Sequence, residues 1–279
     1  MLGALYTGIT GMDAAATNMD VIGNNIANAN TSAFKSSDVN FAAVYSETLV
    51  SIGGKAGNEE GKGVQVVGLK SAWEQGALET TQNSTDLSIT GDGFFQVVEA
   101  DGTSSEATYY TRAGQFRWDN EYYLVDPSDR RVQGYLATDV TNAVFDTSAN
   151  VAIQIDQTTH SEPRIESNGW VTARNSSTGN RDYLYQVAIF NFPSNDGLRK
   201  VTGNLFEETT DSGQPTSATG NPPGQNGAGK VNTNSLEMSN VDLARQFVDL
   251  IVAQRAFQAN SRVISSSAEI LQEVINIIR

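Results

Sequence analysis

The sequence predicts an α+β protein built in several parts, in which a helix at each end of the chain pairs with the other as a coiled coil and an all-β domain lies between them. Apolar residues recur at alternating spacings of three and four in both end segments, which is the period of a helix with one apolar stripe. In the middle of the chain the period changes to two, the period of a strand. Two glycine-rich stretches with few apolar residues, 51–63 and 211–234, flank the β region.

The first segment carries a helical seam, a line of apolar side chains along one face. Glycines at four positions interrupt it, and each costs roughly 1 kcal/mol relative to alanine inside a helix. The helix should therefore be weak alone and need a partner. The seam residues that we expect to take part in polymerisation are Leu2, Leu5, Ile9, Met12, Met19, Ile22 and Ile26.

The last segment shows a longer repeat with the same alternation. Ser239 and Asn240 are good N-cap residues, and Asp242 would fall in the first turn, where the helix dipole favours an anion. From there to the end of the chain a helix would span about 60 Å, at 1.5 Å per residue. The expected seam residues are Leu243, Phe247, Leu250, Phe257, Ile264, Leu271, Ile275 and Ile278.

Short runs rich in β-forming residues fill the middle of the chain. Glycine-containing steps such as Asp101-Gly102, Asn168-Gly169 and Asp196-Gly197 separate them and allow the chain to reverse. The expected strands cover residues 64–69, 94–98, 115–118, 132–136, 151–155 and 183–190.

These patterns predict a plan of helix, linker, β domain, linker and helix, with both termini at the same end if the two seams meet. Such a plan is more typical of a filament subunit than of an enzyme. The expected segments are 1–35 for the first helix, 36–75 for an extended linker, 76–210 for the β domain, 211–235 for a second linker and 236–279 for the last helix.

Composition excludes several classes of function. The 279 residues hold 18 Lys and Arg against 32 Asp and Glu, a net charge of −14, so a nucleic-acid backbone would be repelled. Cysteine is absent, which removes disulfides and thiolate sites. Neither a conventional signal peptide nor a run of about 18 apolar residues is visible, so we expect no membrane insertion.

Residues that could carry chemistry are few. His160 is the only histidine, which rules out a histidine triad or a multi-histidine metal site, and an ordinary surface role is expected for it. Residues 224–230 fit G-x-x-x-x-G-K, but Val231 stands where a P-loop needs Ser or Thr, so we interpret the stretch as a flexible loop. We therefore expect no enzyme activity, cofactor or metal. A pair of carboxylates cannot be excluded by sequence, which leaves a β-rich glycan-binding module or glycosidase as a remote alternative.

Four blocks of sequence resemble the flagellar hook and rod proteins, in the same order as in that family. The first is MDAAATNMDVIGNNIANANTSAF at 12–34, with Lys35 after it, and the last is 236–277. Between them, DLSITGDGFFQV at 86–97 and YTRAGQF at 110–116 resemble the shared β-domain motifs. Ala33 departs from the glycine that the family commonly has. The matching motif residues are Asn24, Asn25, Asn28, Thr31, Phe34, Lys35, Gly91, Gly93, Phe94, Phe95, Asn240, Gln254 and Arg255.

The resemblance implies an exported structural protein of the bacterial flagellar axis. The terminal helices would form an inner coiled-coil tube with the β domain outside, and export would use the flagellar type III apparatus without a cleaved signal. The implied partners are further copies of the chain, other axial proteins, the hook cap and the export chaperone or apparatus. The implied location is the hook or distal rod, periplasmic or extracellular.

Size and motif wording point to different members of this family. The sequence motifs at the two ends of the chain resemble those of a hook protein more closely, whereas the length of the chain is nearer to that of the distal rod protein. We interpret the chain as a short hook protein that joins rod to filament and transmits torque, with the distal rod protein as the alternative.

Overall fold

A computed structural model of the chain describes residues 2–44, 46–48, 59–99, 107–141 and 143–278. It divides into two compact units. Unit 1 contains residues 1–29, 35–72 and 241–279, and unit 2 contains residues 30–34 and 73–240. The predicted fold class is confirmed, because two terminal helices contact each other and the chain between them forms β-sheets.

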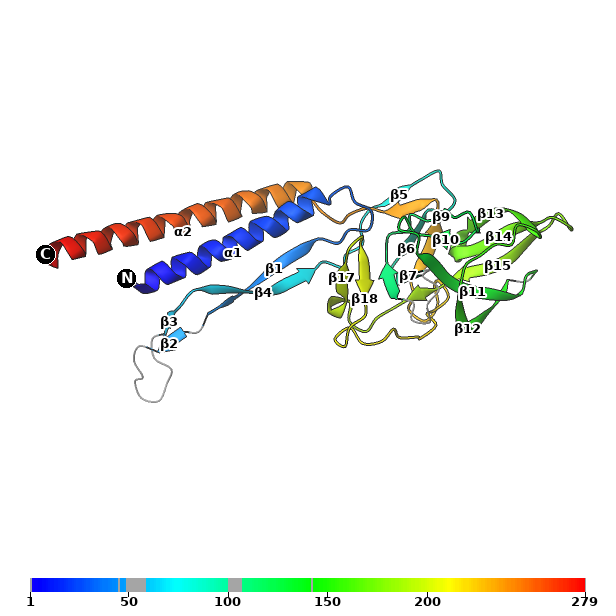
Figure 1. The fold of residues 1–279 in the computed structure, drawn as a ribbon, viewed down its shortest axis with the longest axis horizontal. Coiled ribbons are helices and arrows are strands. Elements are labelled where there is room, and N and C mark those ends of the chain that lie inside the picture. The colour runs from blue at the N-terminus through cyan, green and yellow to red at the C-terminus, as the bar shows by residue number, and fades with distance from the viewer. Residues whose placement is uncertain (1, 45, 49–58, 100–106, 142, 279) are drawn as a thin grey trace. The chain divides into compact units, whose positions relative to one another are not determined.

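Unit 1 consists of two helices and two short hairpins. Helices α1 (Leu2–Ala27) and α2 (Leu243–Ile278) lie side by side, and α1 also contacts β1 (Ser37–Ala43) and β4 (Val64–Ser71) (Figure 1). Strands β1 and β4 pair antiparallel, with a register shift between Asn40 and Phe41. Strands β2 (Ser46–Thr48) and β3 (Glu59–Gly61) form the second hairpin.

The N-terminal end of α2 differs from the prediction. The Asp242 carboxylate accepts hydrogen bonds from the backbone N–H groups of Ala244 and Arg245, at 2.9 and 3.3 Å, so Asp242 is the N-cap. Ser239 and Asn240, the predicted caps, lie upstream of the helix. The Asn240 amide instead donates to the Glu74 carbonyl at 3.2 Å. The prediction was wrong because all three residue types favour an N-cap and only the backbone geometry selects one.

The described residues of unit 2 are built on a 12-stranded sheet. Its main path runs β13-β14-β15-β11-β7-β8-β18-β17, with β12 on β11, β16 on β7, and β9 joined through β10 to β11. Two small pairs, β19 with β6 and β20 with β5, complete the unit. The strands are β5 Leu78–Thr80, β6 Leu87–Thr90, β7 Phe94–Val98, β8 Thr108–Thr111, β9 Arg117–Trp118, β10 Leu124–Val125, β11 Arg131–Asp139, β12 Val144–Ala152, β13 His160–Glu166, β14 Trp170–Asn175, β15 Arg181–Val187, β16 Ile189–Phe190, β17 Arg199–Val201, β18 Leu205–Glu207, β19 Lys230–Thr233 and β20 Ser235–Glu237, with 3-10 turns η1 Ser167–Gly169 and η2 Asn195–Gly197.

Two clusters of buried side chains form the core of unit 2. One is mainly aliphatic and includes Leu87, Val132 and Ile189, and the other is aromatic and includes Phe94 and Phe190. In the tight turn before β7, Gly93 has a φ of +132°, and a Cβ there would lie 2.3 Å from the Ile189 side chain. A larger residue would therefore be both strained and blocked at this position.

Three of the six strands predicted from the sequence lie wholly within observed strands. The runs at 64–69, 94–98 and 132–136 lie inside β4, β7 and β11. The polar stretch around His160 was not predicted as a strand, yet it forms β13, which pairs with β14 along the edge of the sheet. The stretch 211–234 contains no strand until β19, which pairs with β6. Both pairings rest on backbone hydrogen bonds, which polar residues make as readily as apolar ones. No helix among the described residues is long and apolar enough to cross a membrane.

Candidate assembly surface

The two helices of unit 1 run antiparallel and approach closely where α1 has glycines. A Cβ on Gly8 would lie 2.9 Å from the Ile264 side chain, and one on Gly11 would lie 2.6 Å from the Asn260 amide nitrogen. Near the other end of α1, Asn25 contacts Gln246. Gly8 and Gly11, two of the glycines that weaken α1 as an isolated helix, thus allow α2 to pack against its backbone.

Two rows of side chains lie on the face of α2 that packs on α1, and in each row the residues are seven apart in the sequence. The first row includes Leu250, Ile264 and Leu271, which are half-buried. In the second row the side chains are small or polar, and they include Gln246, Ala253, Asn260 and Ser267. This second row lies one residue before the predicted seam position of Phe247 and Ile275, because the close contact between the helices requires small side chains there.

The structure brings part of the predicted seam together and leaves part of it exposed. On α1, Ile22 is buried, Leu5, Met12, Met19 and Ile26 are half-buried, and Ile9 is exposed. On α2, Leu250, Ile264 and Leu271 are half-buried, whereas Leu243, Phe247, Phe257 and Ile275 are exposed. The side chains of Leu2 and Ile278 lie outside the described residues. The role of these residues in polymerisation stays a prediction.

A buried polar contact ties three segments of unit 1 together. The Asn25 amide donates to the Ser37 carbonyl at 2.9 Å and to the Gln246 side-chain oxygen at 3.1 Å, while its own oxygen accepts from the Ser37 N–H at 3.0 Å. Asn25 is 1% exposed, so these bonds satisfy groups that would otherwise be costly to bury. One turn further on, the Asn28 amide donates to the Asn24 carbonyl at 2.9 Å and satisfies a carbonyl at the helix end.

Large apolar side chains remain exposed around much of α2. Phe247 is 51% exposed and Ile251 is 56% exposed, and both belong to the first third of the helix. Gly8 lies opposite Ile264 and Gly11 lies opposite Asn260. Because the helices are antiparallel, Leu2 lies opposite roughly residue 270, and the last two turns of α2 extend beyond α1. The other exposed apolar residues of α2 are Leu243, Val248, Val252, Phe257, Val263, Ile270, Ile275 and Ile277.

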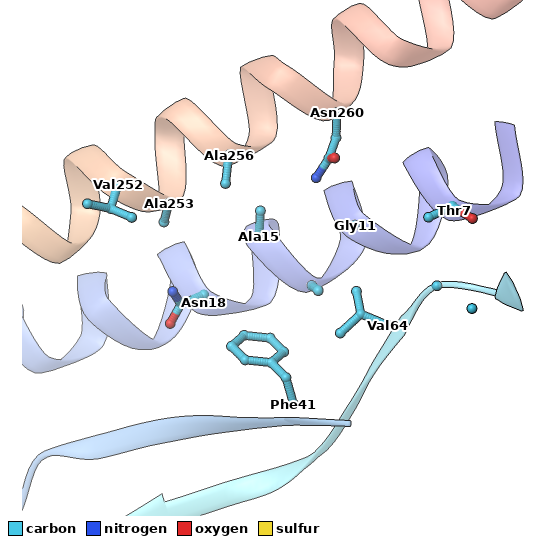
Figure 2. A pocket seen from close by; sticks show the side chains of 13 residues that line it. Thr7, Gly11, Ala15, Asn18, Phe41, Val64, Val252, Ala253, Ala256 and Asn260 are labelled. Atoms are coloured by element: carbon cyan, nitrogen blue, oxygen red, sulfur yellow. The ribbon is translucent and has the colours of Figure 1, made fainter. Parts of the chain in front are cut away.

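Unit 1 also contains a groove of about 580 Å³ that follows α1 (Figure 2). Ala253 and Ala256 of α2 lie on one side of the groove, and Phe41 and Val64 of the β1–β4 pair lie on the other. Gly11 is one of the α1 residues that line it. None of the 13 residues that line it carries a charge.

The charges of the chain are divided unevenly between the units. Unit 1 contains 8 Lys and Arg against 10 Asp and Glu, a net charge of −2, whereas unit 2 contains 10 against 22, a net charge of −12. The surface with the most exposed apolar side chains therefore belongs to the nearly neutral unit. Copies can approach through it with little electrostatic repulsion.

The residues that the sequence analysis considered for chemistry are His160 and the stretch 224–230. His160, for which an ordinary surface role was expected, is half-buried, and its Nε2 lies 3.4 Å from the Asp182 carboxylate on β15. Within the described residues, no group of three or more His, Asp or Glu side chains could hold a metal ion. The stretch 224–230 leads into strand β19 and not into the helix that a P-loop requires.

Comparison with known proteins decides the family. Three family models match in the order expected: "Flagella basal body rod protein" at 5–35, "Flagellar hook protein FlgE/F/G D1 domain" at 88–173 and "Flagellar basal body rod FlgEFG protein C-terminal" at 232–277. The flagellar basal-body rod protein FlgG of Bacillus subtilis is 38% identical over 100% of both chains. The chain belongs to the flagellar hook and basal-body rod family. As a member of this family it is a structural protein of the flagellar axis and not an enzyme.

Matches to individual members of the family differ in extent. FlgG of Borreliella burgdorferi is 33% identical, and the match covers 97% of each chain. The hook protein FlgE of Treponema pallidum is 43% identical, but the match covers 50% of this chain and 31% of that protein. The rod interpretation, which was the alternative in the sequence analysis, therefore fits better than the hook interpretation.

Several family-motif residues of unit 2 meet at one buried ion pair. The Arg112 guanidinium lies 3.4 Å from the Glu237 carboxylate, and their side chains are 5% and 0% exposed. Arg112 also donates to the carbonyl of Gly93, at 3.0 Å, and to that of Gly91. The turn before β7 is thus bound to β20, which precedes α2 in the chain. Phe94 and Phe95, which follow this turn, belong to the two core clusters.

The remaining motif residues are spread over both units. The Phe34 ring is buried in unit 2, with the Lys200 ammonium 4.1 Å from its centroid, and Asn240 donates from its backbone N–H to the Phe34 carbonyl at 3.4 Å. Ala33 has a φ of +56°, the left-handed conformation that favours the glycine common in the family. Lys35 is buried, Thr31 is half-buried, and Gln254 and Arg255 are exposed on α2.

Proposed function

We propose that this chain is the subunit of the distal part of the flagellar rod rather than of the hook. The observation that carries the proposal is coverage: FlgG proteins match the chain from end to end, whereas a hook protein matches half of it. A rod subunit of this kind would lie in the periplasm, after export without a cleaved signal. Its partners would be further copies of itself, the neighbouring axial proteins and the export apparatus.

The geometry of unit 1 supports assembly through the terminal helices. Burial of a large apolar side chain contributes roughly 1.5–3 kcal/mol, so a few of the exposed residues of α2 would stabilise a contact between copies strongly. Unit 2 has its own core and carries most of the charge, which suits an outer, solvated position. We therefore propose a tube whose wall is made by α1 and α2 and whose outer layer is made by unit 2.

The rod and hook interpretations predict different deletion phenotypes. Deleting the gene of a distal rod subunit should give basal bodies with a shortened rod and cells without hooks, since the hook would have nothing to grow from. Electron microscopy of purified basal bodies measures this directly. Complete rods that lack only the hook would contradict the proposal and favour the hook interpretation. Labelling of the chain with an antibody in complemented basal bodies should mark the distal rod.

A further inference from the structure

We infer that the groove along α1 receives the exposed stripe of α2 from a second copy of the chain, formed by Leu243, Phe247 and Ile251. This inference rests on the proposed function, since it names the contact through which subunits of the axis would join. It goes further in specifying which two surfaces meet and in what symmetry.

The groove and the stripe are complementary in the size of their side chains. On the α2 side the groove is bordered by the small side chains of Ala253 and Ala256, which leave room for a large side chain from outside. The stripe offers large side chains at a spacing of four residues, which places Phe247 and Ile251 on one helical face. Inserting the stripe would remove apolar area from water on both surfaces.

The two surfaces lie on different sides of the same helix. At 100° per residue, Phe247 is roughly 180° from Ala256, and Ile251 is roughly 140° from it. A copy cannot insert its own stripe into its own groove, because both belong to one rigid helix. The contact must therefore join two copies.

A contact between two different surfaces of one molecule is heterologous and leaves both surfaces available on each copy for further copies. Isologous contacts close into dimers, whereas heterologous contacts continue from copy to copy and form rings or helical filaments. A contact between the groove on one side of α2 and the stripe on the other side is heterologous. It matches a chain whose family builds the flagellar axis.

Charge favours a second copy as the occupant. The groove has no charged lining residue, and α2 holds three arginines and three acidic residues, so it is neutral. An acidic or basic partner would find no counter-charge there, whereas the neutral helix of another copy does not need one. Unit 1 as a whole carries only −2 of the net charge of −14.

The absence of cysteine in the sequence makes a crosslinking test unambiguous. Two single-substitution chains, Ala256→Cys in the groove and Ile251→Cys in the stripe, would be mixed under assembly conditions and oxidised. We expect disulfides that join position 256 of one copy to position 251 of another, and ladders of higher oligomers when both substitutions are in one chain. Ser266→Cys, an exposed position on α2 outside both surfaces, is the matched control and should give little product. Crosslinks mainly between identical positions, or from position 256 to another protein in cells, would overturn the inference.

Filling the groove gives a second, independent readout. Ala256→Leu keeps a strong helix former but occupies the space that the stripe needs, so the concentration required for assembly should rise at least tenfold. Ala268→Leu makes the same change at another exposed position of α2 and should assemble as the unsubstituted chain does. Normal assembly of Ala256→Leu would contradict the groove contact and leave the proposed function standing. Failure of the unsubstituted chain to assemble at all would contradict both.

Discussion

The Arg112–Glu237 pair places two full charges in the interior of unit 2. A buried ion pair often contributes little net stability, because desolvation offsets the attraction, but removing one partner takes the attraction away while the desolvation cost of the other remains. Here the guanidinium also holds the turn at Gly91 and Gly93. The pair therefore makes the position of this turn depend on the strand that leads to α2.

Removing one member of the pair should cost more than removing both charges. We expect Arg112→Met to destabilise unit 2 by about 3–5 kcal/mol, and Arg112→Met combined with Glu237→Gln to cost less. Thermal unfolding followed by near-ultraviolet circular dichroism measures the difference. Equal losses in the single and double variants would mean that the hydrogen bonds to Gly91 and Gly93, and not the charge on Glu237, determine the cost.

Two buried tyrosines should make unit 2 sensitive to alkali. Burial raises the pKa of Tyr110 and of Tyr135 to about 12, from an ordinary value of 10.0. Between these pH values the unfolded chain loses the proton first, so stability is complete below pH 10 and falls as the pH rises towards 12. The slope is about 1.4 kcal/mol per pH unit for each group.

Tyr135→Phe should remove one of these two contributions. Below pH 9 we expect the variant to be less stable by about 1 kcal/mol, because the hydroxyl no longer donates to the Thr219 carbonyl. Above pH 10 its stability should fall less steeply than that of the unsubstituted chain. Urea unfolding at pH 8, 10 and 11 provides the comparison, and parallel pH profiles for the two chains would refute the assignment.

At the scale of elements, α1 illustrates how position changes the effect of one residue type. Gly11 meets Asn260 of α2, whereas a Cβ on Gly23 would meet no atom within 4 Å. Both glycines weaken an isolated helix equally. Only Gly11 offsets this cost, by allowing the two helices to approach.

Substituting these two glycines should therefore have opposite effects. Gly23→Ala should stabilise α1 by roughly 1 kcal/mol through helix propensity alone. Gly11→Ala should destabilise the helix pair despite the same gain in helix propensity. Its methyl group would lie 2.6 Å from the Asn260 amide nitrogen and push α2 away. Hydrogen exchange of the amides in α1 reports both changes. If both variants protect α1 to the same degree, the close packing of α2 on Gly11 does not exist in solution.

At the scale of the whole molecule, the uneven charge separates two tasks. Unit 2 carries −12 and keeps copies soluble and apart, while unit 1 carries −2 and presents the exposed apolar side chains. Assembly then depends on the balance between apolar contact in one unit and repulsion in the other.

Salt should shift this balance towards assembly. The screening length falls from about 30 Å at 0.01 M to about 10 Å at 0.1 M, so repulsion between the acidic units weakens while apolar contacts are unaffected. We expect the critical concentration for assembly to decrease over this range, as measured by light scattering. A steady increase with salt would instead indicate that ion pairs between subunits dominate the contact.

The sequence alone was enough for the class of fold and the family. The change of period from 3.5 to 2 predicted terminal helices around a β region, and blocks such as NNIAN and TGDGFF indicated the family. The turn of Asn168 and Gly169 was also predictable, and both residues have positive φ. These properties are local, because neighbouring residues determine the period of a segment and the conformation of a turn.

Only the tertiary structure decided which face of α2 meets α1. The sequence placed Phe247 and Ile275 on one side of the seam, but the heptad row of Gln246, Ala253 and Asn260 occupies that place. The choice depends on the distance between two backbones, which Gly8 and Gly11 set from a segment some 250 residues away. The groove likewise needs α1, α2 and a hairpin together. Neither helix contains this information by itself, since a contact between distant segments is a property of both.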